Sequence, residues 1–382
     1  MKMKKSFTFA LITLSIALEC VAQTWDHRGQ LSGWTTINGK QIDRSEVGLR
    51  YLPELSIERS LSCSFSFSSD MALNVFGSGR FEGWNKFNTS LRIKPYRLWL
   101  RFASHQFEGR IGLQKINFGS ATLIRPLMWF DQVDPRDPLQ LTDGVYALLL
   151  RYYFLNNVNC WFWALYGNAE TKGWELIASD RKKIELGGRW QLPIYKGEMG
   201  LSFHHRQLDL KKVQLIRGIP LRTKSIPEYR LGVDGKWDAG IGIWLEVALI
   251  YQKIDLPDMK YQRSMTIGLD YTFNLGNGLH GILENFAYET ADQAFGSGET
   301  LKLSALSLGY PISLLDRITG MIYYDWKNET WYRFISWQRS YDRWQFFLIG
   351  FWNPERFQIY QHRSGENLFA GKGARMMFIF TH

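Results

Sequence analysis

The feature that most constrains this chain is a two-residue alternation of apolar and polar side chains that persists over ten or more residues. Tyr229, Leu231 and Val233 share one face of such a segment. Arg230 and Asp234 share the other face. A period of two belongs to a β-strand, because successive side chains of a strand point to opposite sides of its sheet. The same alternation recurs in residues 181–192, 197–207, 241–252 and 261–273. The pattern predicts a protein of many half-buried strands.

An uncharged stretch at residues 152–169, YYFLNNVNCWFWALYGNA, raises the alternative of a membrane-crossing helix. Its length approaches the roughly 20 apolar residues that a membrane-crossing helix requires. However, Asn156, Asn157 and Asn159 would then lie at the centre of the bilayer. An Asn-Asn pair between two aromatic-rich runs is typical of a tight turn. We therefore interpret the stretch as two strands joined by a turn.

The composition selects among all-β folds. Aromatic residues make up 15% of the chain and include 16 Trp, yet the mean hydropathy is only −0.23. A membrane barrel explains both values, because aromatic side chains gather at the membrane interfaces and every second strand residue faces a polar lumen. Only helices and closed barrels satisfy their backbone hydrogen bonds in lipid. We predict an all-β fold, a transmembrane antiparallel β-barrel formed by residues 23–382 as a single domain. A soluble β-sandwich is the alternative, since its strands also alternate.

The alternation predicts about 18 strands, with 16 as the alternative. The expected strands are 29–38, 45–57, 61–77, 90–102, 107–117, 144–155, 158–168, 181–192, 196–208, 227–237, 240–253, 260–273, 278–290, 300–311, 314–326, 330–339, 341–352 and 371–382. The alternation is mixed in 61–77, 278–290, 300–311 and 330–339, which is the reason for the alternative. Short connections alternate with longer ones at 78–89, 118–143, 209–226 and 353–370. Short periplasmic turns and long outer loops are typical of outer-membrane barrels.

The two ends of the chain predict export and membrane assembly. Residues 1–22 have a basic start, an apolar stretch and a small residue at Ala22, which together indicate a cleaved signal peptide. The last segment, GKGARMMFIFTH, presents Met376, Phe378 and Phe380 on one face. It resembles the C-terminal signal of outer-membrane barrels. We therefore expect an outer-membrane location and recognition by the barrel-assembly machinery.

Charge and cysteine content limit the partners. The net charge is +10, but an exported protein rarely meets nucleic acid, so we expect outer-membrane lipid, lipopolysaccharide and small hydrophilic solutes instead. Cys63 and Cys160 fall on expected strands four apart, too distant for a disulfide, and should be free thiols. The chain has no C-x-x-C or H-E-x-x-H spacing, and no metal or other cofactor is expected.

Parity places a set of charged residues in the lumen. A mildly positive lumen would favour anions. Alternatively, the same side chains pair between neighbouring strands and stiffen the wall. For Arg189, Arg206 and Arg230, we favour a track for solutes over wall braces. The predicted pore-lining residues are Arg97, Arg101, Arg110, Arg189, Arg206, Arg230, Glu185, Glu228 and Asp234.

The connection 118–143 is too apolar for a solvated outer loop, since it contains Leu123, Leu127 and Phe130. We predict that it folds into the lumen as a constriction. A calcium site built from its aspartates is the alternative, because Ca²⁺ prefers oxygen ligands. The predicted constriction residues are Arg125, Trp129, Asp131, Asp134, Arg136 and Asp137.

Residues 108–153 carry a resemblance to a known family. The strand EGRIGLQKINFG, with Gln114, Asn117 and Gly119, is followed by an Asp-rich loop and a second strand. This arrangement resembles alginate-export-type and related porin-like outer-membrane barrels. The resemblance implies an envelope pore with about this number of strands.

No enzyme is predicted. His204 and His205 are adjacent on one strand and point to opposite faces, and no nucleophile elbow, zinc motif or phosphate loop is present. We predict a porin-like channel for the passive passage or export of small hydrophilic solutes, anionic or saccharide. The alternative is a channel-less outer-membrane scaffold or adhesin that acts through its outer loops.

Overall fold

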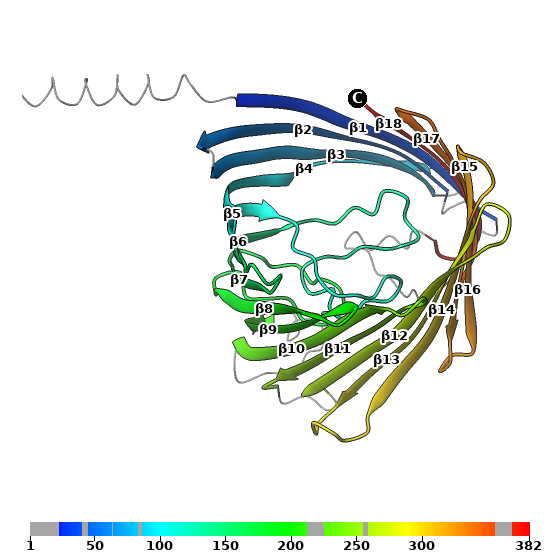
Figure 1. The fold of residues 1–382 in the computed structure, drawn as a ribbon. Coiled ribbons are helices and arrows are strands. Elements are labelled where there is room, and N and C mark those ends of the chain that lie inside the picture. The colour runs from blue at the N-terminus through cyan, green and yellow to red at the C-terminus, as the bar shows by residue number, and fades with distance from the viewer. Residues whose placement is uncertain are drawn as a thin grey trace, which may run out of the picture.

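The computed structural model describes residues 23–39, 45–62, 64–82, 86–211, 225–254, 259–355 and 369–382. Eighteen strands in these residues form one antiparallel sheet that closes on itself (Figure 1). They are β1 (Gln23–Asn38), β2 (Glu46–Ser62), β3 (Phe65–Glu82), β4 (Lys86–Ser104), β5 (Phe107–Gln114), β6 (Val145–Tyr153), β7 (Asn159–Leu165), β8 (Glu185–Ile194), β9 (Gly197–Asp209), β10 (Ser225–Asp238), β11 (Gly242–Gln252), β12 (Tyr261–Phe273), β13 (Leu279–Ala291), β14 (Glu299–Pro311), β15 (Asp316–Asp325), β16 (Thr330–Ser340), β17 (Trp344–Trp352) and β18 (Lys372–Thr381).

The sheet closes where the first strand meets the last. β1 pairs with β18 from Gln30 opposite Thr381 to Asn38 opposite Gly373, and every other strand pairs with its neighbours in sequence. Each expected strand is present, so the prediction of an 18-stranded antiparallel barrel is confirmed and the 16-stranded alternative is wrong. In the described residues, no helix is long and apolar enough to cross a membrane.

Short and long connections lie at opposite ends of the barrel. At the end called the short-turn end, β6 and β7 are joined by residues 154–158, as the uncharged stretch predicted. Asn157 adopts a left-handed φ of 63° there, and its N–H donates to the Phe154 carbonyl. The opposite, long-loop end includes the connection 115–144 between β5 and β6 and the connection 166–184 between β7 and β8.

The mixed alternation arises where apolar side chains face the lumen. In β3, Phe76 lines the interior and stacks on Trp34. The facing strand β4 contains a bulge at Tyr96, because Ala72 pairs with Arg97 while Leu73 pairs with Pro95, and this bulge changes the parity of β4 and not that of β3. In β13, β14 and β16 the pairing is regular, but apolar side chains point inward. Those side chains pack against a chain segment inside the barrel, so an apolar residue there does not mark the outer face.

One predicted loop is wrong. Residues 78–89 were expected to be an outer connection, but β3 continues to Glu82 and β4 begins at Lys86. Cross-strand pairs explain the extension: the rings of Phe81 and Phe87 lie 4.9 Å apart, and the hydroxyls of Ser78 and Ser90 are 3.0 Å apart.

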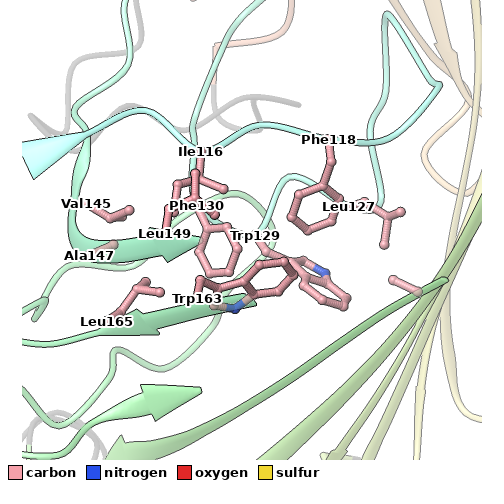
Figure 2. Close-up of a cluster of buried hydrophobic side chains, with 11 residues drawn as sticks. Ile116, Phe118, Leu127, Trp129, Phe130, Val145, Ala147, Leu149, Trp163 and Leu165 are labelled. Carbon is pink, nitrogen blue, oxygen red and sulfur yellow. The ribbon is translucent and has the colours of Figure 1, made fainter. Parts of the chain in front are cut away.

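The core of the molecule lies inside the barrel (Figure 1). Residues 115–144, here called the inward loop, fold into the lumen and bring apolar side chains against β6 and β7 (Figure 2). Residues 166–184, here called the second loop, place Ile177 against β9 and β10. The connection 118–143 therefore lies within the lumen, as predicted.

Candidate pore and its inward loops

A hydrophobic cluster holds the root of the inward loop. Ile116, Phe118 and Phe130 from the loop pack against Leu149 of β6 and Trp163 of β7 (Figure 2). The rings of Phe118 and Trp163 are stacked with their centroids 5.6 Å apart. Burial of aromatic side chains of this size stabilises a loop by several kcal/mol. The loop is therefore a packed part of the interior.

Carboxylates of the far wall hold the middle of the inward loop. Glu284 of β13 accepts hydrogen bonds from the backbone N–H groups of Thr122, Leu123 and Ile124 at 2.7, 3.0 and 2.6 Å. It also accepts the Thr122 hydroxyl and the indole N–H of Trp244. Among the described residues, no lysine or arginine pairs with Glu284. Main-chain N–H groups of the loop therefore solvate this buried charge.

Two neighbouring strands, β11 and β12, provide further anchors for the inward loop. Glu246 of β11 accepts the N–H groups of Ala121 and Leu127 at 2.9 and 2.5 Å. The Thr266 hydroxyl of β12, directly opposite Glu246 in the sheet, donates to the Ile124 carbonyl at 2.7 Å. Residues 120–127 are thus fastened across the lumen by hydrogen bonds of their backbone, which hold this part of the loop in one position.

The predicted constriction residues mainly stabilise the loop itself. Arg125 pairs with Asp131 at 3.0 Å, and Arg136 donates two hydrogen bonds to Asp134 at 3.0 and 2.9 Å. Asp137 accepts the Leu139 N–H, and Trp129 packs edge-on against Phe118. Among the described residues, no group of three or more His, Cys, Asp or Glu side chains is placed to hold a metal ion. Asp131 and Asp134 are each paired with an arginine of the same loop.

Glu175 fastens the second loop. Its carboxylate lies 2.9 Å from the Arg206 guanidinium and 2.7 Å from that of Arg230. Glu228 binds the same two arginines at 2.5 and 2.7 Å. Arg206, Arg230 and Glu228 are all at most 2% exposed. Two carboxylates and two guanidinium groups therefore form a closed network in which all the charges are paired.

The remaining predicted residues of this half of the wall are also paired and buried. Arg189 donates to both carboxylate oxygens of Asp234 at 2.5 and 2.9 Å. His204 of β9 has its Nε2 3.1 Å from the Glu185 carboxylate, and its Nδ1 accepts the Trp163 indole N–H at 3.1 Å. These buried ion pairs stiffen the wall. The predicted solute track through Arg189, Arg206 and Arg230 disagrees with the structure, because the loops cover these side chains.

The arginines of β4 to β6 lie in a more open setting. Arg101, Arg110 and Arg151 surround a single carboxylate, Glu108, at 3.3, 3.0 and 3.7 Å. Their side chains are 31%, 20% and 18% exposed. Two of the guanidinium groups stack on indole rings, Arg110 on Trp99 and Arg151 on Trp161. Arg97, also predicted to line the pore, donates to the Thr142 carbonyl of the inward loop. Positive charge is therefore in excess over the one shared carboxylate.

A cavity of about 490 Å³ separates the inward loop from the wall formed by β1 to β4 and β18. Charged residues of its lining include Arg50, Arg92, Lys94 and Arg375 on the wall and Asp143 at the end of the loop. A second cavity of about 420 Å³ is lined by residues of the loop itself. The adjacent residues Gln132 and Val133 line different cavities, and so do Leu139 and Gln140. The loop backbone therefore divides the two spaces.

Several lining and anchoring residues were missed by sequence reasoning. Glu284 lies on a strand with mixed alternation, so its facing was not clear. Glu175 belongs to a loop, where the alternation of a strand cannot be used to assign the direction of a side chain. Arg92 and Lys94 face the lumen because the Tyr96 bulge changes the parity of β4, so that even positions face inward before the bulge and odd positions after it.

Comparison with known proteins supports the fold. No protein-family model and no curated protein matches the sequence. OmpT, an outer membrane protein of Vibrio cholerae in its trimer form, is 9% identical with a TM-score of 0.52, covering 94% of this chain and 99% of that chain. OmpF of Salmonella typhi in complex with daunomycin is 9% identical with a TM-score of 0.51, covering 94% and 97%. At such low identity the likeness shows the fold alone, a closed antiparallel β-barrel like those of these outer-membrane proteins. The alginate-export type is not singled out.

Proposed function

We propose that the chain is an outer-membrane channel for the passive passage of small hydrophilic solutes, and that it is not an enzyme. The observation that carries the proposal is the asymmetry of the lumen. Loops and paired charges fill the side formed by β7 to β13, whereas the cavity beside β1 to β4 and β18 is lined by charged side chains. The solute path runs along this second side and continues past the arginines of β4 to β6.

The outer face supports a membrane location. On β12, Tyr261 and Tyr271 point outward from opposite ends, with Met265, Ile267 and Leu269 between them. Ten residues at a rise of about 3.4 Å and a tilt of about 45° separate the two tyrosines by about 24 Å along the barrel axis. This matches the apolar band of an outer-membrane barrel, about 25 Å tall with aromatic residues at both borders. Arg263, two residues after Tyr261 on the same face of β12, is paired with Glu289 at that border.

The proposal includes a preference for anions. Arg101, Arg110 and Arg151 share one carboxylate and are partly exposed, so their charge acts on solutes in the lumen. Ions pass this group at the short-turn end. Outer-membrane lipid and lipopolysaccharide surround the barrel, and the assembly machinery recognises β18; both belong to the proposal.

Planar-bilayer recording of the purified protein tests it. The wild type should form ion-conducting channels with an anion-favouring reversal potential under a salt gradient. Replacing Arg101, Arg110 and Arg151 with Gln should reduce the anion-to-cation permeability ratio by roughly twofold or more. The matched control replaces Arg181, Lys182 and Lys183 with Gln, because these three exposed residues lie on the connection before β8. An equal shift in the control would contradict the assignment of selectivity to the β4 to β6 arginines.

A channel-less scaffold or adhesin is the second candidate. It is favoured by one observation: the inward loop reaches from the β6 and β7 side to β13 and β14 and buries its apolar residues on the way. Folded, membrane-inserted protein that carries no current would support this candidate and exclude the channel.

A further inference from the structure

The cavity beside β1 to β4 and β18 contains a buried cation without a carboxylate partner. Arg375 of β18 lines the cavity and is 2% exposed. Its Nε donates to the Thr36 hydroxyl at 2.7 Å, and its Nη1 has no hydrogen-bond partner. In the described part of the chain, no carboxylate lies within ion-pair distance of this guanidinium. A buried charge is costly unless an opposite charge compensates it.

The acidic residues of the lining are occupied elsewhere. Asp143 pairs with Lys94 at 2.6 Å, and Glu46 accepts the Trp34 indole N–H and lies 3.5 Å from Arg80. Asp137 accepts a backbone N–H from its own loop, and its charge and that of Glu46 act on Arg375 without forming an ion pair with it. Glu170 is exposed at the edge of the cavity. The charge of Arg375 is therefore only partly compensated, by carboxylates that do not contact it.

Two further cations reinforce the positive wall. Arg50 of β2 lies over the rings of Trp34 and Phe76, with its guanidinium carbon 5.4 and 4.8 Å from their centroids. Stacking fixes the plane of this guanidinium, so a ligand that binds it loses little side-chain freedom. Arg92 of β4 is exposed and lines the same cavity. The site thus offers several guanidinium groups to one anion.

The remaining lining selects the kind of anion. Leu139, Leu141 and Met377 give the cavity an apolar side, which suits a carbon skeleton better than an inorganic ion. Asn74 of β3 also lines it, and the Oδ1 of this buried side chain has no donor. A ligand hydroxyl would supply one. The volume of about 490 Å³ fits a molecule the size of a monosaccharide.

We propose that this cavity binds a small hydroxylated organic carboxylate, whose carboxylate group compensates Arg375 with support from Arg50 and Arg92. The inference rests on the proposed function, since the solute enters through the aqueous lumen. It deepens that function by naming a solute class and a place where the solute pauses. Because neither Nη1 nor Asn74 Oδ1 is open to solvent, small side-chain movements accompany binding.

Isothermal titration of the detergent-purified barrel with sodium gluconate tests the site, with sorbitol as the neutral analogue and sodium chloride as the inorganic anion. Gluconate should bind, and sorbitol and chloride should bind at least tenfold more weakly. Arg375→Gln should weaken gluconate binding by about tenfold or more, and Arg375→Lys by less. Arg92→Gln, an exposed position, provides a variant whose folding is not at risk. Arg339→Gln, on β16 and absent from the cavity lining, is the control.

Gluconate affinity within twofold of wild type in both Arg375→Gln and Arg92→Gln would overturn the site, and so would equal binding of sorbitol or chloride. Bilayer recording tests the channel separately from the binding site. Gluconate binding without conductance removes the channel and keeps the site. Conductance without gluconate binding removes the site and keeps the channel.

Discussion

Replacing Glu284 with Gln should release the middle of the inward loop from the far wall. The Glu284 carboxylate accepts five hydrogen bonds, four of them from Thr122, Leu123 and Ile124. Gln has nearly the same shape but only one oxygen. Its amide nitrogen is a donor, so it cannot accept the bonds that one of the two carboxylate oxygens accepts now.

The size of the effect follows from those bonds. If the amide oxygen takes the place of Oε1, the N–H groups of Leu123 and Ile124 lose their acceptor. Hydrogen bonds to a charged group contribute about 1.5–3 kcal/mol each, so the docked state should lose about 3–6 kcal/mol relative to the undocked state. That change lowers the ratio of docked to undocked loop by roughly two to four powers of ten.

Hydrogen exchange measured by mass spectrometry is the direct assay. Amides 121–127 should exchange faster by a comparable factor in Glu284→Gln, while the amides of β11 to β13 keep their protection. Single-channel recordings should show larger or more variable conductance. Glu299→Gln is the matched control, because Glu299 is an exposed acid paired with Lys327. Unchanged exchange at 121–127 in a folded Glu284→Gln barrel would refute the docking role of this carboxylate.

Three other changes have defined outcomes. Glu228→Gln removes the carboxylate shared by Arg206 and Arg230, so it should lower the free energy of unfolding by about 3–5 kcal/mol. On an unboiled gel, where a folded barrel migrates faster than the unfolded chain, the variant should unfold at a lower temperature than the wild type. Its reversal potential in a bilayer should be unchanged. Deletion of residues 120–127 should raise single-channel conductance, and an unchanged value would show that the loop does not limit flow. Gly173→Ala should loosen the second loop and speed its proteolysis, because Gly173 has a φ of +48° and an added Cβ would lie 1.9 Å from the Met128 carbonyl oxygen.

The wall was largely predictable, because its physics is local. Alternation identifies a strand when one face is apolar and the other is polar, and Tyr229, Leu231 and Arg230 satisfy that condition. The Asn-Asn turn was predictable for a similar reason, since a left-handed backbone at Asn157 requires a residue that tolerates it.

The interior was less predictable, because its partners are distant in sequence. Phe286 and Leu303 face inward against Leu123 and Ile124, and no pattern within β13 or β14 reveals that contact. The entry of the inward loop into the lumen could be inferred from its apolar residues, but the choice of Glu284 as an anchor could not. Backbone N–H groups are its ligands, and these are present at nearly every position of any chain.

Cys160 lies on β7 and is a free thiol, whereas Cys63 lies outside the described residues. The expectation that both are free therefore stays a prediction. It rests on the expected strand order, in which four strands at about 4.8 Å each separate the two positions by about 19 Å along the wall.

The fastening of residues 120–127 to β11, β12 and β13 constrains the order of assembly. The barrel closes only when β18 pairs with β1, and β18 follows the other described strands in the sequence. A loop of 30 residues that is attached at both ends and buried against three later strands is most easily enclosed while the sheet is still an open ribbon. Hydrogen bonds formed at that stage would link β5 and β6 to β13 before the sheet closes. A chain that closed first would have to pass the loop into a finished barrel.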